Sequence, residues 1–335
     1  MEILKIVIYL VVGFFLLVKG ADWFVDGASG IAHKMHIPSL IIGLTVVAMG
    51  TSLPELSVSV TAALSGQNSL AISNVVGSNI FNLVVILGIC AVFAPVAVSR
   101  EVLKRDYPFS IFCSVLLAVL GVVCIYGKGW RIDRVDGLIL LFFFVLYMTM
   151  MLREAIRARK GALSTEESDY VDVMDYEVEE NIKKDEDKPL WVSILLVIVG
   201  TAAVKFGGDF TVEGAVAGAR MLGVSETLIG LTIVACGTSL PELVTSIVAT
   251  KKQELEMAVG NVVGSNIFNI LMILGVGAII SPMTFIGENL IDILVLTAFS
   301  LIIWVFGWTK EKITRLEGIS MLVMYGVYLT YICIR

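Results

Sequence analysis

A string that combines a carboxylate, two hydroxyls and a proline occurs twice in this chain, each time inside an apolar stretch. The copies are Gly50-Thr51-Ser52-Leu53-Pro54-Glu55 and Gly237-Thr238-Ser239-Leu240-Pro241-Glu242. A second string follows each copy at the same interval: Gly77-Ser78-Asn79-Ile80-Phe81-Asn82 and Gly264-Ser265-Asn266-Ile267-Phe268-Asn269. Carboxylates inside apolar segments are costly and typically mark a pathway for ions or protons. The duplication predicts a site built where two halves of one chain meet.

Proline is expected to break the helix in each copy of the first string. It lacks an N–H and clashes with the carbonyl four residues back, so Pro54 frees the carbonyl of Gly50. Pro241 frees that of Gly237 in the same way. Irregular backbone is tolerated at membrane depth only where it lines a cavity or packs against protein. We therefore expect two broken helices beside one polar cavity.

The broken helices would supply two kinds of oxygen to that cavity. The first half-helix ends in carbonyls, among them those of Ala48 and Ala235, which carry partial negative charge. Glu55 and Glu242 open the second half-helix, whose positive end favours an ionised carboxylate. An anionic gap rich in oxygen atoms is typical of a site for a hard cation.

The second string predicts another polar wall. Asn74, Ser78 and Asn82 fall at positions i, i+4 and i+8, which share one face of a helix. The second copy repeats this face with Asn261, Ser265 and Asn269. Such a stripe can serve as interhelical glue. With a buried glutamate beside each copy, we interpret it as part of the ion site.

Charge restricts the ion. Two glutamates neutralise one Ca²⁺, which takes about six to eight oxygen ligands, whereas Mg²⁺ holds its water and demands a rigid octahedron. Na⁺ can use the same oxygens, and protons can neutralise the same carboxylates. Competition for one set of ligands is what an antiporter requires. We expect no resident cofactor, because the ions are substrates.

The composition indicates the surroundings of this site. Apolar residues make up 57% of the 335-residue chain and charged residues 16%, with a mean hydropathy of +0.91. A soluble fold could not bury that much apolar surface. Runs long enough to cross a hydrocarbon core predict ten helices, centred in 5–32, 38–66, 69–94, 107–126, 135–157, 190–219, 225–250, 256–281, 288–308 and 315–334. The expected fold is an all-α polytopic membrane protein, whose partners are membrane lipid and ions and not nucleic acid.

The repeat extends beyond the two strings. Residues 20–82 align with residues 207–269 without a gap. With five helices in each half, an odd number of crossings, the second half enters the membrane from the opposite side, so the halves form an inverted repeat. We expect the first half at 1–160, an acidic linker at 161–189 and the second half at 190–335.

Basic residues predict how the chain is oriented. Most of the 24 lysines and arginines fall in loops on the side of the linker. We therefore expect a multi-pass cell-membrane protein with a cytoplasmic linker and both termini outside. The linker is dense in Asp and Glu, which is typical of a solvated tether. A calcium sensor in the linker is less favoured, because its sequence has no EF-hand loop pattern.

The duplicated strings resemble the α-repeats of the sodium/calcium exchanger family, within the Ca²⁺/cation antiporter superfamily, and the resemblance covers nearly the entire chain. It implies exchange of external Na⁺ for cytosolic Ca²⁺, typically about three for one, with the long first and sixth helices sliding across the bundle to alternate access. The implied ligands in the first half are Thr51, Ser52, Glu55, Ser78, Asn82 and the Ala48 carbonyl. Those in the second half are Thr238, Ser239, Glu242, Ser265, Asn269 and the Ala235 carbonyl. The resemblance implies that the glutamates and threonines bind Ca²⁺ and that the serines complete flanking Na⁺ sites.

Asn82 and Asn269 depart from some relatives in that family. Potassium-dependent exchangers carry Asp at one of these positions, and some prokaryotic relatives carry Asp in place of Asn269, whereas this chain has Asn at both. That difference weighs against coupling to K⁺. Three Na⁺ against two carboxylates would leave a net charge of about +1, so we expect electrogenic exchange.

Three other functions remain open on the sequence alone. A Ca²⁺/H⁺ antiporter of the same superfamily would use the glutamates for protons, although the paired serines favour Na⁺ because protons need no extra oxygens. A cation channel is less favoured, because channels usually assemble rings around a continuous pore. An enzyme is least favoured, because no nucleophile or His-rich metal motif accompanies the glutamates. The oligomeric state is open, and a monomer is compatible with the repeat.

Overall fold

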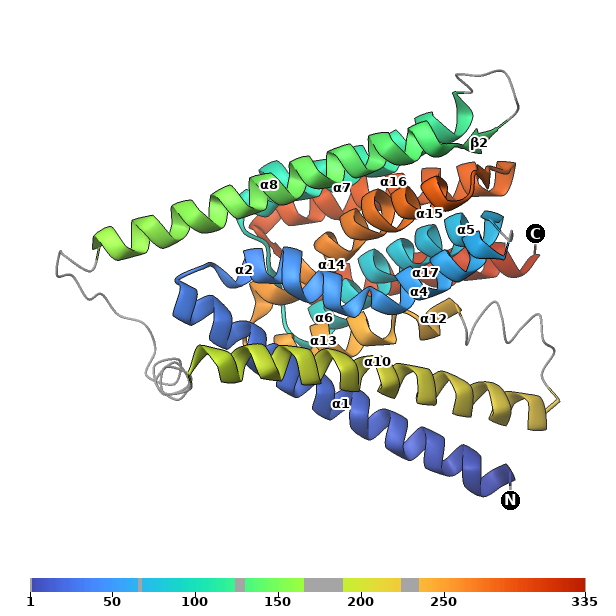
Figure 1. The fold of residues 1–335 in the computed structure, drawn as a ribbon, viewed down its shortest axis with the longest axis horizontal. Helices are drawn as coiled ribbons and strands as arrows, with labels where there is room; N and C mark the ends of the chain where they lie inside the picture. Colours follow the sequence, from blue (N-terminus) through green and yellow to red (C-terminus); the bar gives the residue numbers. More distant parts are fainter. Residues whose placement is uncertain (1, 66–67, 124–129, 166–188, 224–234, 335) are drawn as a thin grey trace.

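Long helices dominate the residues that the computed structural model describes, which are 2–65, 68–123, 130–165, 189–223 and 235–334 (Figure 1). The elements of the first half are α1 (Glu2–Met35), α2 (Ser39–Ile42), η1 (Gly43–Val47), α3 (Ala48–Thr51), α4 (Leu53–Leu64), α5 (Asn68–Ile80), η2 (Phe81–Ile86), α6 (Leu87–Phe93), β1 (Val96–Ala97), η3 (Val102–Asp106), α7 (Tyr107–Val122), β2 (Arg131–Ile132) and α8 (Arg134–Thr165). Those of the second half are α10 (Leu190–Met221), α12 (Ala235–Gly237), α13 (Leu240–Lys251), α14 (Leu255–Phe268), η5 (Asn269–Ile273), α15 (Leu274–Ile280), β3 (Met283–Thr284), α16 (Gly287–Lys310), β4 (Lys312–Ile313) and α17 (Arg315–Ile334). The η elements are π-helical turns within longer helices.

The described helices span a membrane many times. Eight unbroken helices are long and apolar enough to cross it, and Ser39–Thr51 with Leu53–Leu64 forms a ninth, broken span that bends by 48°. The helix predicted at 225–250 begins outside the described residues, and its described part comprises α12 and α13. The all-α membrane fold is therefore confirmed, while the count of ten helices stays a prediction. Most of the linker also lies outside the described residues.

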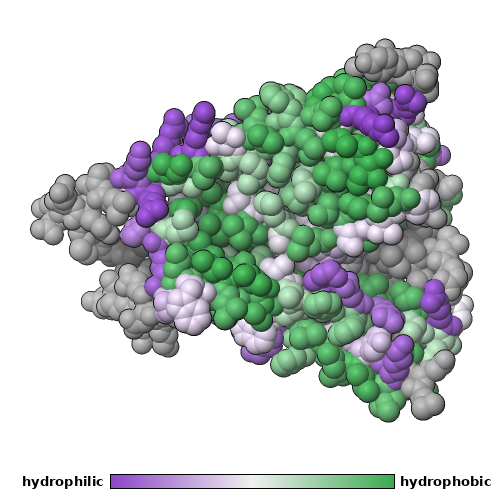
Figure 2. Space-filling model, in the orientation of Figure 1, coloured by the Kyte–Doolittle hydropathy of each residue, from purple (hydrophilic) through white to green (hydrophobic). Residues whose placement is uncertain are grey.

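Two central spans carry the second string. In Ala71–Phe93 and Leu255–Ile280, 83% and 78% of the apolar window is buried, against 17–39% in the other unbroken spans. The outer helices expose large apolar side chains, for example Phe14, Phe142 and Val323. Figure 2 shows hydrophobic residues over the middle of one face, with hydrophilic residues mainly toward its two ends. The outer helices therefore face lipid, and the two central spans form the core.

The two halves are inverted copies. α1 runs from the end of the molecule that holds both termini, and α10 runs back toward that end (Figure 1). Two short antiparallel sheets join the halves reciprocally, because β1 pairs with β4 and β2 with β3. Opposite directions of equivalent helices are what an inverted repeat requires.

Glycines bring α1 and α10 into close contact. A Cβ atom at Gly200 would lie 2.6 Å from the backbone nitrogen of Phe24, and one at Gly207 would lie 2.5 Å from that of Leu17. Small residues at such interfaces let the backbones of membrane helices approach each other. The two longest helices of the halves therefore form one packed pair.

We expect Gly200→Leu to lower the free energy of unfolding by about 1–3 kcal/mol, because the backbone of Phe24 cannot move aside without separating the pair. Gly326→Leu in α17 is the control, since no described atom lies within 4 Å of a Cβ atom there. Thermal unfolding in detergent measures both variants. Equal melting temperatures would contradict the close packing of α1 on α10.

Ion pairs tie α1 to the turn between α13 and α14. Lys252 Nζ lies 2.6 Å from Asp22 Oδ1 and 2.5 Å from Asp26 Oδ1. In the same turn, Glu254 accepts a hydrogen bond from the Ser29 hydroxyl. Burial by itself lowers the pKa of Lys252, but hydrogen bonds with Asp22 and Asp26 and their charges raise the pKa above its ordinary 10.5. Lys252 is therefore a charged link between the α1 helix and the second half.

Lys252→Met is expected to lower the free energy of unfolding by about 1.5–3 kcal/mol, because two carboxylates lose a charged hydrogen-bond donor. The raised pKa means that this stabilisation is complete below pH 10.5 and is lost only as the pH rises through the higher folded-state pKa. Lys251→Met, at the exposed neighbouring residue, is the control. The difference in melting temperature between the two variants should be the same at pH 7 and at pH 9. Identical melting temperatures of Lys252→Met and Lys251→Met would show that the ion pairs contribute nothing to stability.

Candidate cation site

The helix break predicted at each proline is present. Ser52 separates α3 from α4 with φ −82° and ψ 11°, and Ser239 precedes α13 with φ −90° and ψ 7°. Pro54 and Pro241 lie in the first turn of the helix that follows, where a missing N–H removes no helical hydrogen bond. Each break is a short kink between two helical segments.

Both glutamates lie where their charge is stabilised by the helix. Glu55 is in the first turn of α4 and Glu242 in the first turn of α13, and both side chains are 0% exposed. The partial positive charge of a helix N-terminus favours a carboxylate at that place. The prediction that each carboxylate lies at the start of the second half-helix is confirmed.

Serine hydroxyls connect the glutamates across the two halves. Ser52 Oγ donates to Glu242 Oε1 at 2.8 Å, and Ser239 Oγ donates to Glu55 Oε1 at 3.2 Å. Ser78 on α5 donates to the same Glu55 oxygen at 2.9 Å, and its Oγ lies 2.5 Å from Ser239 Oγ. Each kink therefore supports the glutamate of the other half, and the serines and glutamates form one polar cluster.

Thr51 and Ser265 join this cluster through Asn261. Thr51 Oγ1 lies 3.0 Å from Asn261 Oδ1, and Ser265 Oγ lies 3.5 Å from the same oxygen. Ser265 Oγ also lies 3.4 Å from the Ala48 carbonyl oxygen, within hydrogen-bond distance. Ala235 begins α12 directly after residues outside the described ranges, so its predicted role stays a prediction.

Several buried oxygens of the predicted set have no hydrogen-bond partner among the described residues. They are Glu55 Oε2, Glu242 Oε2, Asn82 Oδ1, Asn269 Oδ1 and Thr238 Oγ1. Leaving such an atom unsatisfied costs about 1–3 kcal/mol, and buried polar groups in native proteins are normally satisfied. Carboxylate, hydroxyl and amide oxygens are the ligands that Ca²⁺ takes. The cluster therefore holds buried oxygens of the kinds that coordinate a hard cation.

Two asparagines to which the sequence analysis assigned no role join the central helices. Asn79 Nδ2 donates to the Asn266 carbonyl at 3.0 Å, and Asn266 Nδ2 donates to the Asn79 carbonyl at 3.1 Å. The exchange of donors reflects the two-fold relation of the halves. In the sequence, only their equivalent positions in the two strings indicated that these asparagines could pair between the central helices.

The central helices widen into π-helical turns at Asn82 and Asn269. Asn82 lies in η2 and Asn269 begins η5. A π-helical turn displaces the residues after it from regular helical spacing and frequently occurs at functional sites. The i, i+4 pattern in the sequence does not reveal such a turn.

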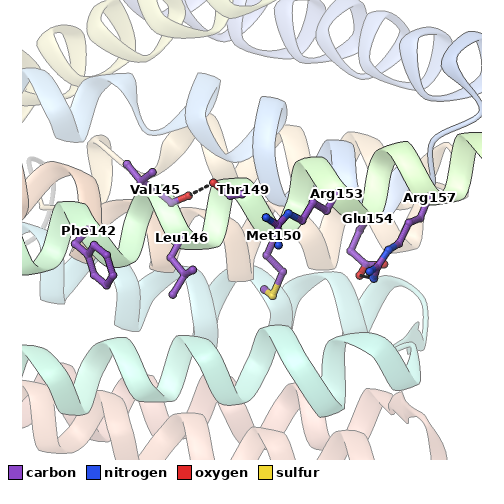
Figure 3. Close-up of a pocket in the computed structure, with 8 residues that line it drawn as sticks. All are labelled: Phe142, Val145, Leu146, Thr149, Met150, Arg153, Glu154 and Arg157. Carbon is purple, nitrogen blue, oxygen red and sulfur yellow. Dashed lines mark hydrogen bonds and ion pairs between the residues drawn. The ribbon is translucent and has the colours of Figure 1, made fainter.

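A groove on the outer face of α8 is separate from this cluster. It is lined by α8 alone, from Phe142 to Arg157 (Figure 3). The lining is mostly apolar, and at one end Arg157 pairs with Glu154 at 3.3 Å. No residue of the duplicated strings lines it, so we assign this groove to the lipid-facing surface.

Inverted halves, broken helices and a buried acidic cluster between them define a membrane transporter for cations. A family model described as sodium/calcium exchanger protein matches residues 5–153 and 192–334. The chain belongs to the sodium/calcium exchanger family, as its duplicated strings predicted. This is a family of transporters and not of enzymes.

Similar proteins match along nearly the whole chain. Inner membrane protein YrbG of Escherichia coli (strain K12) is 38% identical over 88% of this chain and 87% of its own length. The sodium/calcium exchanger MaX1 of Methanosarcina acetivorans is 32% identical, over 96% of each chain. A solved structure of the sodium-calcium exchanger NCX_Mj, soaked with 10 mM Na⁺ and 10 mM Sr²⁺, is 32% identical with a TM-score of 0.80, and the match covers 98% of this chain and 99% of that one. The fold and the family are thus those of an exchanger.

Proposed function

We propose that this protein exchanges Na⁺ for Ca²⁺ at the polar cluster between its halves. The observation that carries the proposal is the pair of fully buried glutamates, Glu55 and Glu242, each with one carboxylate oxygen that lacks a partner. Two negative charges balance one Ca²⁺ and satisfy its preference for oxygen ligands. The names of MaX1 and NCX_Mj, both sodium/calcium exchangers, support the same pair of ions.

The ligands divide between the two ions. In this proposal Ca²⁺ binds Glu55 and Glu242 with the hydroxyls of Thr51 and Thr238. Na⁺ takes flanking positions formed by the same glutamates with further oxygens, namely those of Ser52, Ser78, Ser239, Ser265, Asn82 and Asn269 and the carbonyls of Ala48 and Ala235. The hydrogen bonds between serines and glutamates support this division, because a cation beside a glutamate also meets a hydroxyl oxygen.

Transport would follow from movement of the α1–α10 pair across the rest of the molecule. The glycine contacts make this pair one unit, and the exposed apolar side chains of α1 allow it to slide in lipid. Inward flow of Na⁺ would drive Ca²⁺ out of the cell. We assign about three Na⁺ to each Ca²⁺, so that one net charge crosses per cycle. We propose that both termini lie outside and the linker in the cytoplasm, a topology that the distribution of basic residues supports.

Calcium uptake into proteoliposomes tests the function. Vesicles loaded with Na⁺ should take up ⁴⁵Ca²⁺ from Na⁺-free buffer, and vesicles with equal Na⁺ on both sides should not. Uptake driven by a pH gradient without Na⁺ would replace the proposal with Ca²⁺/H⁺ antiport. Calcium flux that needs no counter-ion gradient and exceeds carrier rates would indicate a channel.

A further inference from the structure

Asn82 and Asn269 occupy equivalent positions in the two halves but have different surroundings. Asn269 Nδ2 donates a hydrogen bond to Asn79 Oδ1 at 3.0 Å. Neither side-chain atom of Asn82 has a partner among the described residues. Both side chains are 0% exposed. The repeat is therefore symmetric in sequence and asymmetric in the contacts of these two amides.

Asn79 determines which way the Asn269 amide points. The Asn79 Nδ2 group donates to the carbonyl oxygen of Asn266. A flip of the Asn79 amide would place its Oδ1 against that carbonyl oxygen, and neither atom can donate a hydrogen bond. Asn79 Oδ1 must then face a donor, and Asn269 supplies it with Nδ2. Because an amide has its oxygen opposite its nitrogen, Asn269 Oδ1 points away from Asn79.

That oxygen is buried on an element that contacts the helix of Glu55. Asn269 begins η5, which packs against α4, the helix of Glu55. Its Oδ1 atom has no hydrogen-bond partner among the described residues. The oxygen of an amide can coordinate a cation, whereas its NH₂ group repels one. The fixed orientation therefore presents a ligand atom before any ion arrives, which lowers the cost of binding.

We propose that Asn79 is a positioning residue that holds the oxygen of Asn269 toward the transported cation, while the amide of Asn82 is free to turn. This inference rests on the proposed function. It makes the two halves of the site unequal, with a preset ligand in the second half and an adaptable one in the first. Asn266 supplies a matched comparison, because it makes the same hydrogen bond between the halves but its Oδ1 has no described partner.

The first test compares Asn79→Ala with Asn266→Ala. Asn266→Ala loses one hydrogen bond between the halves and Asn79→Ala loses two, so both should lower the melting temperature, Asn79→Ala by more. Asn79→Ala alone should raise the Ca²⁺ concentration at half-maximal exchange, on the order of fivefold, the effect of one neutral hydrogen bond. Asn266→Ala should change that concentration by less than about twofold. Equal effects of the two variants on this concentration would overturn the proposal.

A double-mutant cycle with Asn269→Ala separates positioning from a general structural role. In the Asn269→Ala background, Asn79→Ala should produce no further change in the half-saturating Ca²⁺ concentration. The same fold-change in both backgrounds would show that Asn79 does not act through Asn269. If Asn79→Ala is not monodisperse in detergent, Asn79→Ser enters the same cycle. Absence of any Na⁺-driven uptake by the wild-type protein would instead refute the proposed function, so the two failures are distinguishable.

Discussion

Glu55→Gln and Glu242→Gln are each expected to reduce Na⁺-driven Ca²⁺ uptake by at least about a hundredfold. Glutamine keeps the size of the side chain and an oxygen that can accept the serine hydrogen bonds, but it removes one of the two charges that balance Ca²⁺. Removing one member of a buried charge pair costs about 3–5 kcal/mol, and about 1.4 kcal/mol corresponds to a factor of ten. Uptake of ⁴⁵Ca²⁺ by proteoliposomes measures the loss.

Glu288→Gln is the matched control for these variants. Glu288 is also in the first turn of a helix, α16, but it is exposed and lies outside the duplicated strings. It should transport at the wild-type rate. The glutamate variants should remain folded, with melting temperatures no lower than that of the wild type, because a buried charge has been removed from an unsatisfied site. Full transport by either glutamate variant would remove that residue from the proposed site.

Membrane potential should have the second large effect. If three Na⁺ exchange for one Ca²⁺, each cycle moves one net charge, and 100 mV is worth about 2.3 kcal/mol per charge. The Ca²⁺ gradient at equilibrium should therefore change by about fiftyfold per 100 mV. An exchange of two Na⁺ per Ca²⁺ is electroneutral and would show no dependence on potential.

Proteoliposomes with potentials set by valinomycin and K⁺ gradients test this prediction. The final distribution of ⁴⁵Ca²⁺ is measured at several potentials with fixed Na⁺ concentrations. A second series sets the potential with a proton ionophore at constant K⁺, because K⁺ coupling would otherwise imitate a response to voltage. Agreement of the two series would support charge movement without K⁺, in line with Asn at both 82 and 269.

Local chemistry explains why much of this protein is predictable from its amino-acid sequence. Pro54 and Pro241 cannot continue a helix, so the kinks at Ser52 and Ser239 follow from residues near them in the chain. The same prolines place each glutamate in the first turn of the next helix. Apolar runs of sufficient length predict membrane spans because water is excluded from their surroundings. The class of fold, the broken helices and the buried carboxylates were all predictable on these grounds.

Tertiary packing decides which partner each polar atom finds, and the sequence repeat cannot show this. Ser78 donates to Glu55, while its counterpart Ser265 lies against Asn261 and the Ala48 carbonyl. Asn269 is held by Asn79, while Asn82 has no described partner. Identical strings have identical local conformational preferences. Which hydrogen bonds their side chains form depends on how the two halves pack and on the residues around them. The sequence by itself therefore determined which groups are candidates for the proposed site, and only the packed structure decided which of them are held by hydrogen bonds and which have lone pairs without a described partner.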